Sequence, residues 1–266
     1  MVTRESAVAS IAASGSELAA ASFRTAMDVE TKSSKVDPVT AADRRTQAHI
    51  VERIESAFPT DTIVGEEDDA LKTLPDTGIA WIIDPIDGTL NYSRGLHTWV
   101  TSVTVVEDRD PVGAANVAPT LGDTYVATTD SVTLNDTPTS VSDNADPESF
   151  LVASTLRLST TDHDRIGVVA DRVTERFGEF RRIGSAQLTL SLVASGAFDA
   201  VVGFEAEPQP WDTVGGVYHV RQAGGTVTDV DGNRWEPGGP GLVASNGRCH
   251  DAVQAVADEV RVTETD

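Results

Sequence analysis

The sequence predicts a mixed fold, with an α+β first half followed by an α/β second half. Apolar residues recur at helical spacing up to about residue 58, and short β-branched runs separated by Gly, Pro and Asp turns follow from residue 63 to 141. From residue 151 onward, strand-like and helix-like stretches alternate, which is typical of an α/β architecture. We therefore predict two subdomains, residues 1–145 and 146–266, which meet near the polar stretch 142–148.

Two helices are predicted at the start of the chain. The first covers Glu5 to Met27, although Ser14-Gly15-Ser16 weakens its middle. The second begins after Thr40-Ala41-Ala42-Asp43, which fits a capping box, and ends before Pro59. Residues 32–39 are predicted to form the loop between the two helices.

The predicted strands of the first half form a sheet that packs on these two helices, and strands and helices alternate in the second half. The first-half strands span residues 81–83, 99–106, 112–117 and 124–128. The second-half strands span residues 151–154, 180–183, 200–203, 225–230 and 242–245, and its helices span residues 164–177, 187–195, 213–223 and 251–260.

The charge balance restricts the class of partner. The formal net charge is -22, and only three of the 20 basic residues are lysines. A nucleic acid needs a basic face, so the composition predicts a small-molecule partner and no nucleic acid. Acidity spread along the whole chain is typical of adaptation to high salt, where the screening length falls to about 3 Å at 1 M. An ordinary acidic cytosolic protein is the alternative.

The cysteine count and the hydropathy pattern bear on the compartment. Cys249 is the only cysteine, so no internal disulfide can form. No apolar stretch approaches the roughly 20 residues that a membrane-spanning helix needs. We therefore expect a cytoplasmic protein that does not associate with membranes.

The most informative segment is Asp84 to Asn91, which reads Asp-Pro-Ile-Asp-Gly-Thr-Leu-Asn directly after the apolar run Ile79 to Ile83. The run predicts a buried strand, so two carboxylates would lie at a strand end, where open sheets place ligand sites. Gly88-Thr89 then begins a predicted helix, whose free amides suit a phosphate. Carboxylates beside an anion-binding turn predict a metal ion between them.

Two further segments complete the pattern. Gly65-Glu66-Glu67 follows an apolar stretch upstream, and Trp211-Asp212-Thr213-Val214-Gly215-Gly216 lies far downstream. In this order, the three segments resemble the signature of the inositol monophosphatase family, which comprises Mg-dependent, lithium-sensitive phosphatases and includes archaeal fructose-1,6-bisphosphatases. The resemblance covers nearly the whole chain and implies the layered α-β-α-β-α sugar phosphatase fold, a homodimer and inhibition by Li⁺.

The resemblance also implies the metal ligands. Glu66, Asp84 and the backbone carbonyl of Ile86 would hold a first Mg²⁺, and Asp84, Asp87 and Asp212 a second, with two or three ions in each site. Oxygen ligands of this kind suit Mg²⁺, which keeps several of its waters. Taken singly, each residue also has a structural interpretation: the two aspartates of the motif as turn residues, Glu66 as a solvated loop residue and Asp212 as a helix cap.

The remaining catalytic roles follow from the same resemblance. Thr89 would orient the attacking water with Glu66 as its acceptor, and the amides of Gly88 and Thr89 would hold the phosphate. Lys32 and Asp43 match accessory positions of the family, although Asp43 also fits the acidic member of a capping box. Thr89 could equally be the cap of its own helix.

The substrate-binding part departs from the family pattern. Gly184-Ser185-Ala186 resembles the family segment that contacts the substrate, and a helix start capped by Ser185 is the alternative. The family glutamate that usually ends the strand after Phe198-Asp199-Ala200 is replaced here by Gly203, while Glu205 and Glu207 lie in a slightly longer connection to Trp211. Either glutamate could take its place, or neither, and Glu205 is the candidate that we assign to substrate binding.

These observations predict a phosphoric monoester hydrolase of carbohydrate metabolism that acts on inositol monophosphate, fructose 1,6-bisphosphate or both. A 3'-phosphoadenosine 5'-phosphate phosphatase of the same family is the first alternative. A non-catalytic protein that binds a metal or a sugar phosphate is the second. Asp-x-Asp near residue 229, by contrast, is explained by a hairpin turn, because Asp231-Gly232 is a strong hairpin signal.

Overall fold

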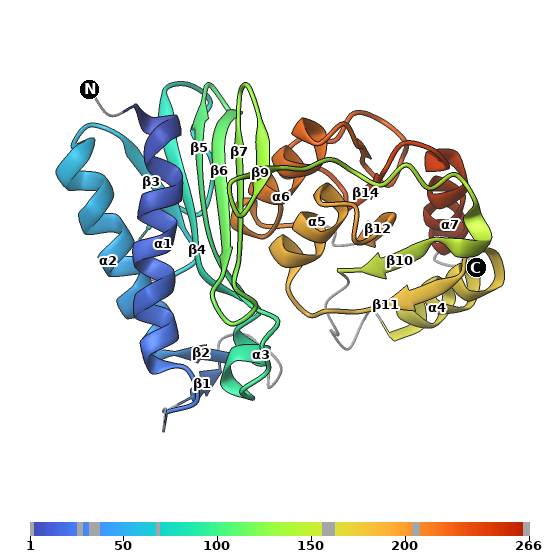
Figure 1. The fold of residues 1–266 in the computed structure, drawn as a ribbon, viewed down its shortest axis with the longest axis horizontal. Coiled ribbons are helices and arrows are strands. Elements are labelled where there is room, and N and C mark those ends of the chain that lie inside the picture. The colour runs from blue at the N-terminus through green and yellow to red at the C-terminus, as the bar shows by residue number, and fades with distance from the viewer. Residues whose placement is uncertain are drawn as a thin grey trace.

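Five layers of secondary structure make up the molecule (Figure 1). The structure is a computed structural model that describes residues 3–25, 29–31, 38–67, 70–155, 163–203 and 208–262. Helices α1 (Arg4–Ser22) and α2 (Ala41–Ala57) cover a seven-stranded sheet. Helices α5 (Ala186–Ala194) and α6 (Pro210–Gln222) lie between this sheet and a five-stranded sheet, and α4 (His163–Arg176) and α7 (His250–Val262) cover the far side. This arrangement confirms the predicted α-β-α-β-α fold.

The first two helices are shifted slightly from their predicted positions. Helix α1 spans Arg4–Ser22, so it ends five residues before the predicted Met27, and Phe23 after it is already extended. Helix α2 spans Ala41–Ala57. Part of the predicted loop before it is strand, because β2 (Pro38–Thr40) pairs with β1 (Val29–Thr31). The side chain of Thr40, which we predicted as a cap, lies outside the described residues.

Gly15, which was predicted to weaken the middle of α1, lies where α1 and α2 pack closely together. A Cβ atom on Gly15 would lie 2.6 Å from Cδ1 of Ile50 on α2. Because a side chain would collide there, glycine allows α2 to approach α1 closely, and Ile50 is fully buried.

The seven strands of the first sheet follow one another in chain order. They are β3 (Thr62–Gly65), β4 (Ile79–Asp87), β5 (Val100–Glu107), β6 (Asp110–Ala118), β7 (Asp123–Thr128), β8 (Val132–Leu134) and β9 (Thr137–Pro138). Only β3 and β4 are parallel, and every other neighbouring pair is antiparallel. The short helix α3 (Thr89–Ser93) follows β4. Because β3 and β4 are parallel, the residues after them lie at the same edge of the sheet.

The second sheet has mixed strand directions. Its strands are β10 (Leu151–Ser154), β11 (Glu179–Arg181), β12 (Ala200–Gly203), β13 (Thr226–Thr228) and β14 (Leu242–Ser245), in the order β11-β10-β12-β14-β13. The helices are η1 (Pro147–Ser149), α4 (His163–Arg176), α5 (Ala186–Ala194), α6 (Pro210–Gln222) and α7 (His250–Val262). Strands β10, β11 and β12 are parallel, whereas β14 is antiparallel to both of its neighbours.

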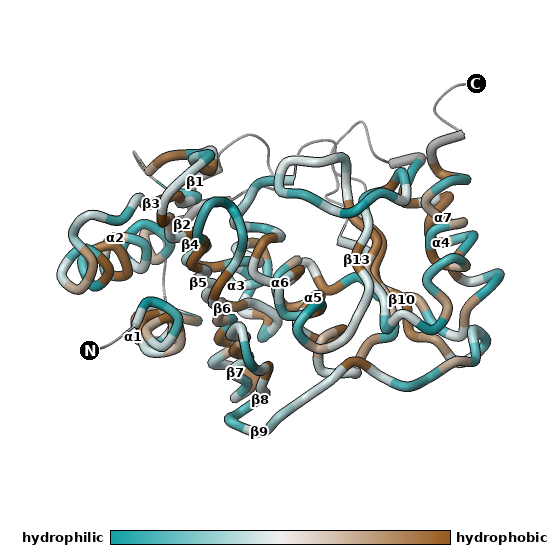
Figure 2. Tube along the Cα trace, turned by 90° about the horizontal axis from the view of Figure 1, so that it is seen from above, coloured by the Kyte–Doolittle hydropathy of each residue, from teal (hydrophilic) through white to brown (hydrophobic). Residues whose placement is uncertain are grey.

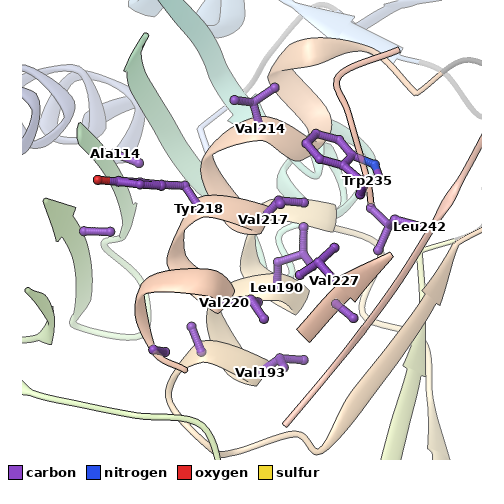
Figure 3. Close-up of a cluster of buried hydrophobic side chains, with 14 of the residues drawn as sticks. Ala114, Leu190, Val193, Val214, Val217, Tyr218, Val220, Val227, Trp235 and Leu242 are labelled. Atoms are coloured by element: carbon purple, nitrogen blue, oxygen red, sulfur yellow. The ribbon is translucent and has the colours of Figure 1, made fainter. Parts of the chain in front are cut away.

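The largest apolar cluster lies between the two sheets, around α5 and α6. Figure 3 shows Leu190 and Val193 of α5 close to Val217 and Val220 of α6, with Val227 of the second sheet beside them. Along the chain, apolar stretches follow the inner strands, whereas hydrophilic stretches lie on the outer loops (Figure 2). Burial of this cluster fixes α6, and therefore Asp212 near its start, against the first sheet.

A buried carboxylate joins α1 to the first sheet. Asp61 accepts hydrogen bonds from Nε and Nη2 of Arg4, at 2.6 and 2.8 Å, and from Nε1 of Trp81 at 2.9 Å. Its side chain is only 2% exposed. Burial alone would raise the pKa of Asp61, but the hydrogen bonds from Arg4 and Trp81 lower the pKa below its ordinary 3.8.

Asp61→Ala should lower the free energy of unfolding by about 1.5–3 kcal/mol, because hydrogen bonds to a buried charge are lost and Trp81 is left without its acceptor. A folded-state pKa below the unfolded value means that this stability is present above pH 3.8 and is lost as the pH falls toward the folded-state pKa. Urea unfolding at pH 7 and pH 3 measures both effects. The exposed pair Arg109 with Asp76 is the control, and Asp76→Ala should change the stability by less than about 0.5 kcal/mol.

Candidate active site

A bulge in β4 brings the two aspartates of the motif together. Asp84 pairs with Ser102 of β5 and Asp87 pairs with Val100, so two residues of β4 stand opposite the single residue Thr101. In a regular strand, residues three positions apart point to opposite faces, and the extra residue of a bulge reverses that alternation. The Thr101 hydroxyl donates to the carbonyl of Pro85 at 2.8 Å and holds the bulge.

Asp84, Asp87 and Asp212 form a buried acidic cluster. One carboxylate oxygen from each lies within 4.8 Å of the other two. The exposed fraction is 2% for Asp84, 6% for Asp87 and 4% for Asp212. Asp212 lies in the first turn of α6, which begins at Pro210, so it is not the cap of a helix that starts at Thr213. Two segments that are 125 residues apart in the chain therefore supply one site.

The electrostatics of this cluster fit a cation. Burial, followed by the negative charges of Glu66, Asp87 and Asp212, raises the pKa of Asp84 well above its ordinary value. Buried like charges at this separation repel one another, and a divalent cation with a preference for oxygen ligands removes that repulsion. The donor set therefore fits Mg²⁺.

Glu66 reaches the cluster from the end of β3. Its backbone N–H donates to the carbonyl of Ile83 at 3.2 Å, which continues the pairing of β3 with β4. The buried side-chain amide of Gln47 forms two hydrogen bonds with the backbone of Glu67. Its Nε2 donates to the Glu67 carbonyl, and its Oε1 accepts from the Glu67 N–H. Lys72 donates from Nζ to the carbonyls of Gly65 and Glu66, at 2.8 and 3.0 Å. Sequence reasoning missed both Gln47 and Lys72, since neither lies in a motif.

Thr89 has different acceptors from the one predicted. Its hydroxyl is 3.1 Å from Oδ1 of Asp43 and 3.0 Å from the carbonyl of Ile86, whereas Glu66 was expected to accept. The helix cap is Gly88 and not Thr89. Asp43, in the first turn of α2, is fully buried and brought to the motif by the packing of α2 on β4. The tertiary structure therefore places Asp43, one of the two accessory candidates, in direct contact with Thr89.

The turn after β4 needs glycine. Gly88 has φ 93°, in the left-handed region, and a Cβ atom there would lie 3.1 Å from the carbonyl oxygen of Thr98 and 3.2 Å from that of Gly184. Asn91 holds the neighbouring segments, because its Nδ2 donates to Thr98 at 2.7 Å and to the Ile183 carbonyl at 2.9 Å. The Gly184 segment of the second half therefore packs directly on the motif.

The predicted substrate segment binds Asp87. The N–H groups of Ala186 and Gln187, at the start of α5, donate to the Asp87 carboxylate at 3.2 and 2.7 Å, and the Ser185 hydroxyl donates to it as well. Ser185 also caps α5, since its oxygen accepts from the N–H of Leu188 at 3.2 Å. The structure thus gives this segment a role in holding a predicted metal ligand.

Comparison with known proteins identifies the family. A sequence model described as the inositol monophosphatase family matches residues 2–261. The chain belongs to the inositol monophosphatase family. A fructose-1,6-bisphosphatase/inositol-1-monophosphatase of Thermotoga maritima is 34% identical over 234 residues, which cover 88% of this chain and 87% of the relative.

Two further comparisons extend the similarity over most of the chain. The structure of Thermotoga maritima IMPase is similar, with a TM-score of 0.87, 31% identity and coverage of 97% of both chains. A Nus factor SuhB of Xylella fastidiosa is 32% identical over 232 residues, covering 84% of this chain and 82% of that protein. The family membership makes the chain a phosphoric monoester hydrolase, as the sequence predicted.

Some expectations for this family member fall outside what the structure describes. Lys32, Glu205 and Glu207 lie outside the described residues. Gly203, at the position of the family glutamate, ends β12.

No helix among the described residues has the length and apolarity to cross a membrane. The homodimer, the cytoplasmic location, the adaptation to salt, the absence of a nucleic-acid partner and the subdomain boundary at residue 145 stay predictions.

Proposed function

We propose that this chain hydrolyses inositol monophosphate and fructose 1,6-bisphosphate with Mg²⁺ as cofactor. The observation that carries the proposal is the buried cluster of Asp84, Asp87 and Asp212, whose oxygens lie within 4.8 Å of one another. Such a cluster is costly to bury without a cation, and its position beside Gly88 matches a site for a phosphate. The Thermotoga maritima relative carries both activities in its name, which supports the choice of substrates.

The ligands divide into two groups. In the proposal Glu66, Asp84 and the Ile86 carbonyl hold one ion, and Asp84, Asp87 and Asp212 hold a second. The Thr89 hydroxyl has one proton and lies 3.0 Å from the Ile86 carbonyl and 3.1 Å from Oδ1 of Asp43, so when the proton points to Asp43 the carbonyl is available to a cation. When bound, Mg²⁺ would neutralise charge on the transferring phosphoryl group and make the attacking water more acidic.

The pair formed by Thr89 and Asp43 would direct the water. If Oγ1 of Thr89 accepts a hydrogen bond from the water, the threonine proton points to Oδ1 of Asp43, 3.1 Å away. As the water oxygen bonds to phosphorus and the bond from phosphorus to the alcohol oxygen breaks, the water proton can move to Thr89 while the threonine proton moves to Asp43. The released alcohol oxygen takes its proton from solvent water, and no phosphoenzyme forms. Asp43 lies in the first turn of α2 and is fully buried, so bulk solvent does not compete for this hydrogen bond.

The other side chains of the proposal concern the substrate. The amides of Gly88 and Thr89 would hold the phosphate, and Gly184, Ser185 and Ala186 would border the substrate next to Asp87. Glu205 would bind a substrate hydroxyl in place of the family glutamate. These assignments set the orientation of the ester and leave the hydrolytic step to the residues around Asp84.

A panel of phosphate esters tests the proposal. With Mg²⁺, we expect the highest kcat/KM for inositol 1-phosphate or fructose 1,6-bisphosphate, at least about tenfold above 3'-phosphoadenosine 5'-phosphate, because a differential contact of about 1.4 kcal/mol gives that factor. EDTA should stop phosphate release and added Mg²⁺ should restore it. Preferred hydrolysis of the adenosine bisphosphate would support the first alternative. Absence of release from every ester would support a non-catalytic binding protein and contradict the proposal.

A further inference from the structure

Gln187 touches both segments that carry the acidic cluster. Its backbone N–H donates to Oδ2 of Asp87 at 2.7 Å, and its side-chain Nε2 donates to the carbonyl of Trp211 at 2.6 Å. Trp211 directly precedes Asp212 in α6. Gln187 is only 1% exposed, so water does not compete for these hydrogen bonds. One residue therefore connects Asp87 of the first half with the start of α6.

Asn116 of β6 fixes the direction of the Gln187 amide. Its Nδ2 donates to Oε1 of Gln187 at 3.1 Å and to the hydroxyl of Ser191 at 2.9 Å, and Asn116 is fully buried. If the Gln187 amide were flipped, its oxygen would face the Trp211 carbonyl, which is also an acceptor. The side chain can therefore satisfy both partners in only one orientation.

Two glycines of α6 allow this close arrangement. A Cβ atom on Gly216 would lie 2.5 Å from Cβ of Leu190 and 3.1 Å from Oε1 of Gln187. A Cβ atom on Gly215 would lie 3.3 Å from the same oxygen. Any side chain at Gly216 would push α6 away from α5, and with it the first turn that carries Asp212. Packing and hydrogen bonding thus act on the same distance, the one between Asp87 and Asp212.

We propose that Gln187 is a positioning residue that sets the separation of Asp87 and Asp212 and so tunes the affinity of the site for Mg²⁺. The inference rests on the proposed function, because it assumes that these two carboxylates bind the cation. Residues that orient metal ligands typically change metal affinity by 10- to 100-fold when they are replaced. Gln187 acts through Asp87 and the Trp211 carbonyl, and it does not contact the reacting atoms.

The test compares Gln187→Met with the wild type. Methionine has nearly the same size but cannot donate to the Trp211 carbonyl. We expect the Mg²⁺ concentration at half-maximal phosphate release to rise about tenfold, with kcat largely recovered at saturating Mg²⁺. The Mg²⁺-dependent rise in Tm, measured without substrate, should shift to higher Mg²⁺ by a similar factor. A purely structural role would lower Tm at all Mg²⁺ concentrations and leave both midpoints unchanged.

Two further variants keep the test decisive. Asn116→Ala leaves Gln187 in place but frees its amide, so it should shift the Mg²⁺ midpoints in the same direction even if Gln187→Met folds poorly. Gln254→Leu in α7 is the matched control, since it removes an amide that donates to the Val230 carbonyl at 2.9 Å, outside the acidic cluster. Its Mg²⁺ midpoints should match the wild type.

The outcomes separate the inference from the function on which it rests. Wild-type Mg²⁺ midpoints in both Gln187→Met and Asn116→Ala would overturn the role of Gln187 while leaving the proposed function intact. A wild-type protein whose Tm and phosphate release do not respond to Mg²⁺ would instead contradict the proposed function.

Discussion

Asp84→Asn is expected to reduce Mg²⁺-dependent phosphate release by about 10³-fold or more. In the proposed site, Asp84 would be a ligand of both ions. Metal ions stabilise the transition state of phosphate transfer by several kcal/mol, so losing this ligand should be costly. The fold should stay intact. Asparagine keeps the acceptor that binds the N–H of Ile86 at 3.0 Å, and it removes a charge from a buried cluster of like charges. The Tm without Mg²⁺ should therefore be equal to or above that of the wild type, and its rise on adding Mg²⁺ should be lost.

The matched control for this variant is another buried aspartate. Asp199, which is 7% exposed, accepts from the N–H of Leu151 at 2.8 Å and from the hydroxyl of Ser142, and it belongs to no acidic cluster among the described residues. Asp199→Asn should lower Tm while leaving the Mg²⁺ dependence of activity unchanged. Near-wild-type turnover in Asp84→Asn would refute the assignment of the acidic cluster.

Thr89→Ala is expected to lower kcat by about 10²- to 10⁴-fold, the usual contribution of a positioned proton-transfer group. The substitution removes the Thr89 hydroxyl, which lies 3.1 Å from Oδ1 of Asp43. The attacking water then loses the group that would accept its proton and pass a proton on to Asp43. Steady-state kinetics at saturating Mg²⁺ measure the effect. The Mg²⁺ concentration at half-maximal activity should stay within about threefold of the wild type, unlike that of Gln187→Met.

Two variants examine whether the hydroxyl and its acceptor act together. Thr89→Ser keeps the hydroxyl and should retain activity within about tenfold of the wild type. Asp43→Ala removes the acceptor, and combining it with Thr89→Ala should cost little more than either change alone, because residues that act as a unit are not additive. Independent, multiplying effects of the two substitutions would contradict the proton path from Thr89 to Asp43.

Much of the fold could be read from local patterns. Apolar periodicity located α1, α2 and most strands, because helices and strands bury residues at different spacings. The ends were less accurate. Helix α6 begins at Pro210 and not at Thr213, since proline is accepted in the first turn of a helix, where no backbone donor is needed. Strands β8 and β9 were missed, because three and two residues are too short to show alternation.

The candidate site was predicted as a set of residue types, and its internal contacts were not. Asp84, Asp87 and Asp212 were named from their motifs, and the structure brings them together. The acceptor of Thr89 was misassigned, because Asp43 lies 46 positions away and only the packing of α2 on β4 shows that it arrives there. Gln187 gave no signal at all, since a single glutamine inside an apolar helix has no recognisable spacing.

The sequence by itself determined the chemical character of this protein. Carboxylates at a strand end, a glycine turn and a second acidic helix start specify oxygen ligands for a hard cation beside a phosphate site, because these properties belong to the residue types and to their local backbone. The tertiary structure alone decided which partners these groups have. The bulge in β4 turns Asp84 and Asp87 to one side, the start of α5 holds Asp87, and the packing of α6 carries Asp212 to both. Distances between segments from two halves of a chain depend on how the buried layers fit, and no local pattern encodes that fit.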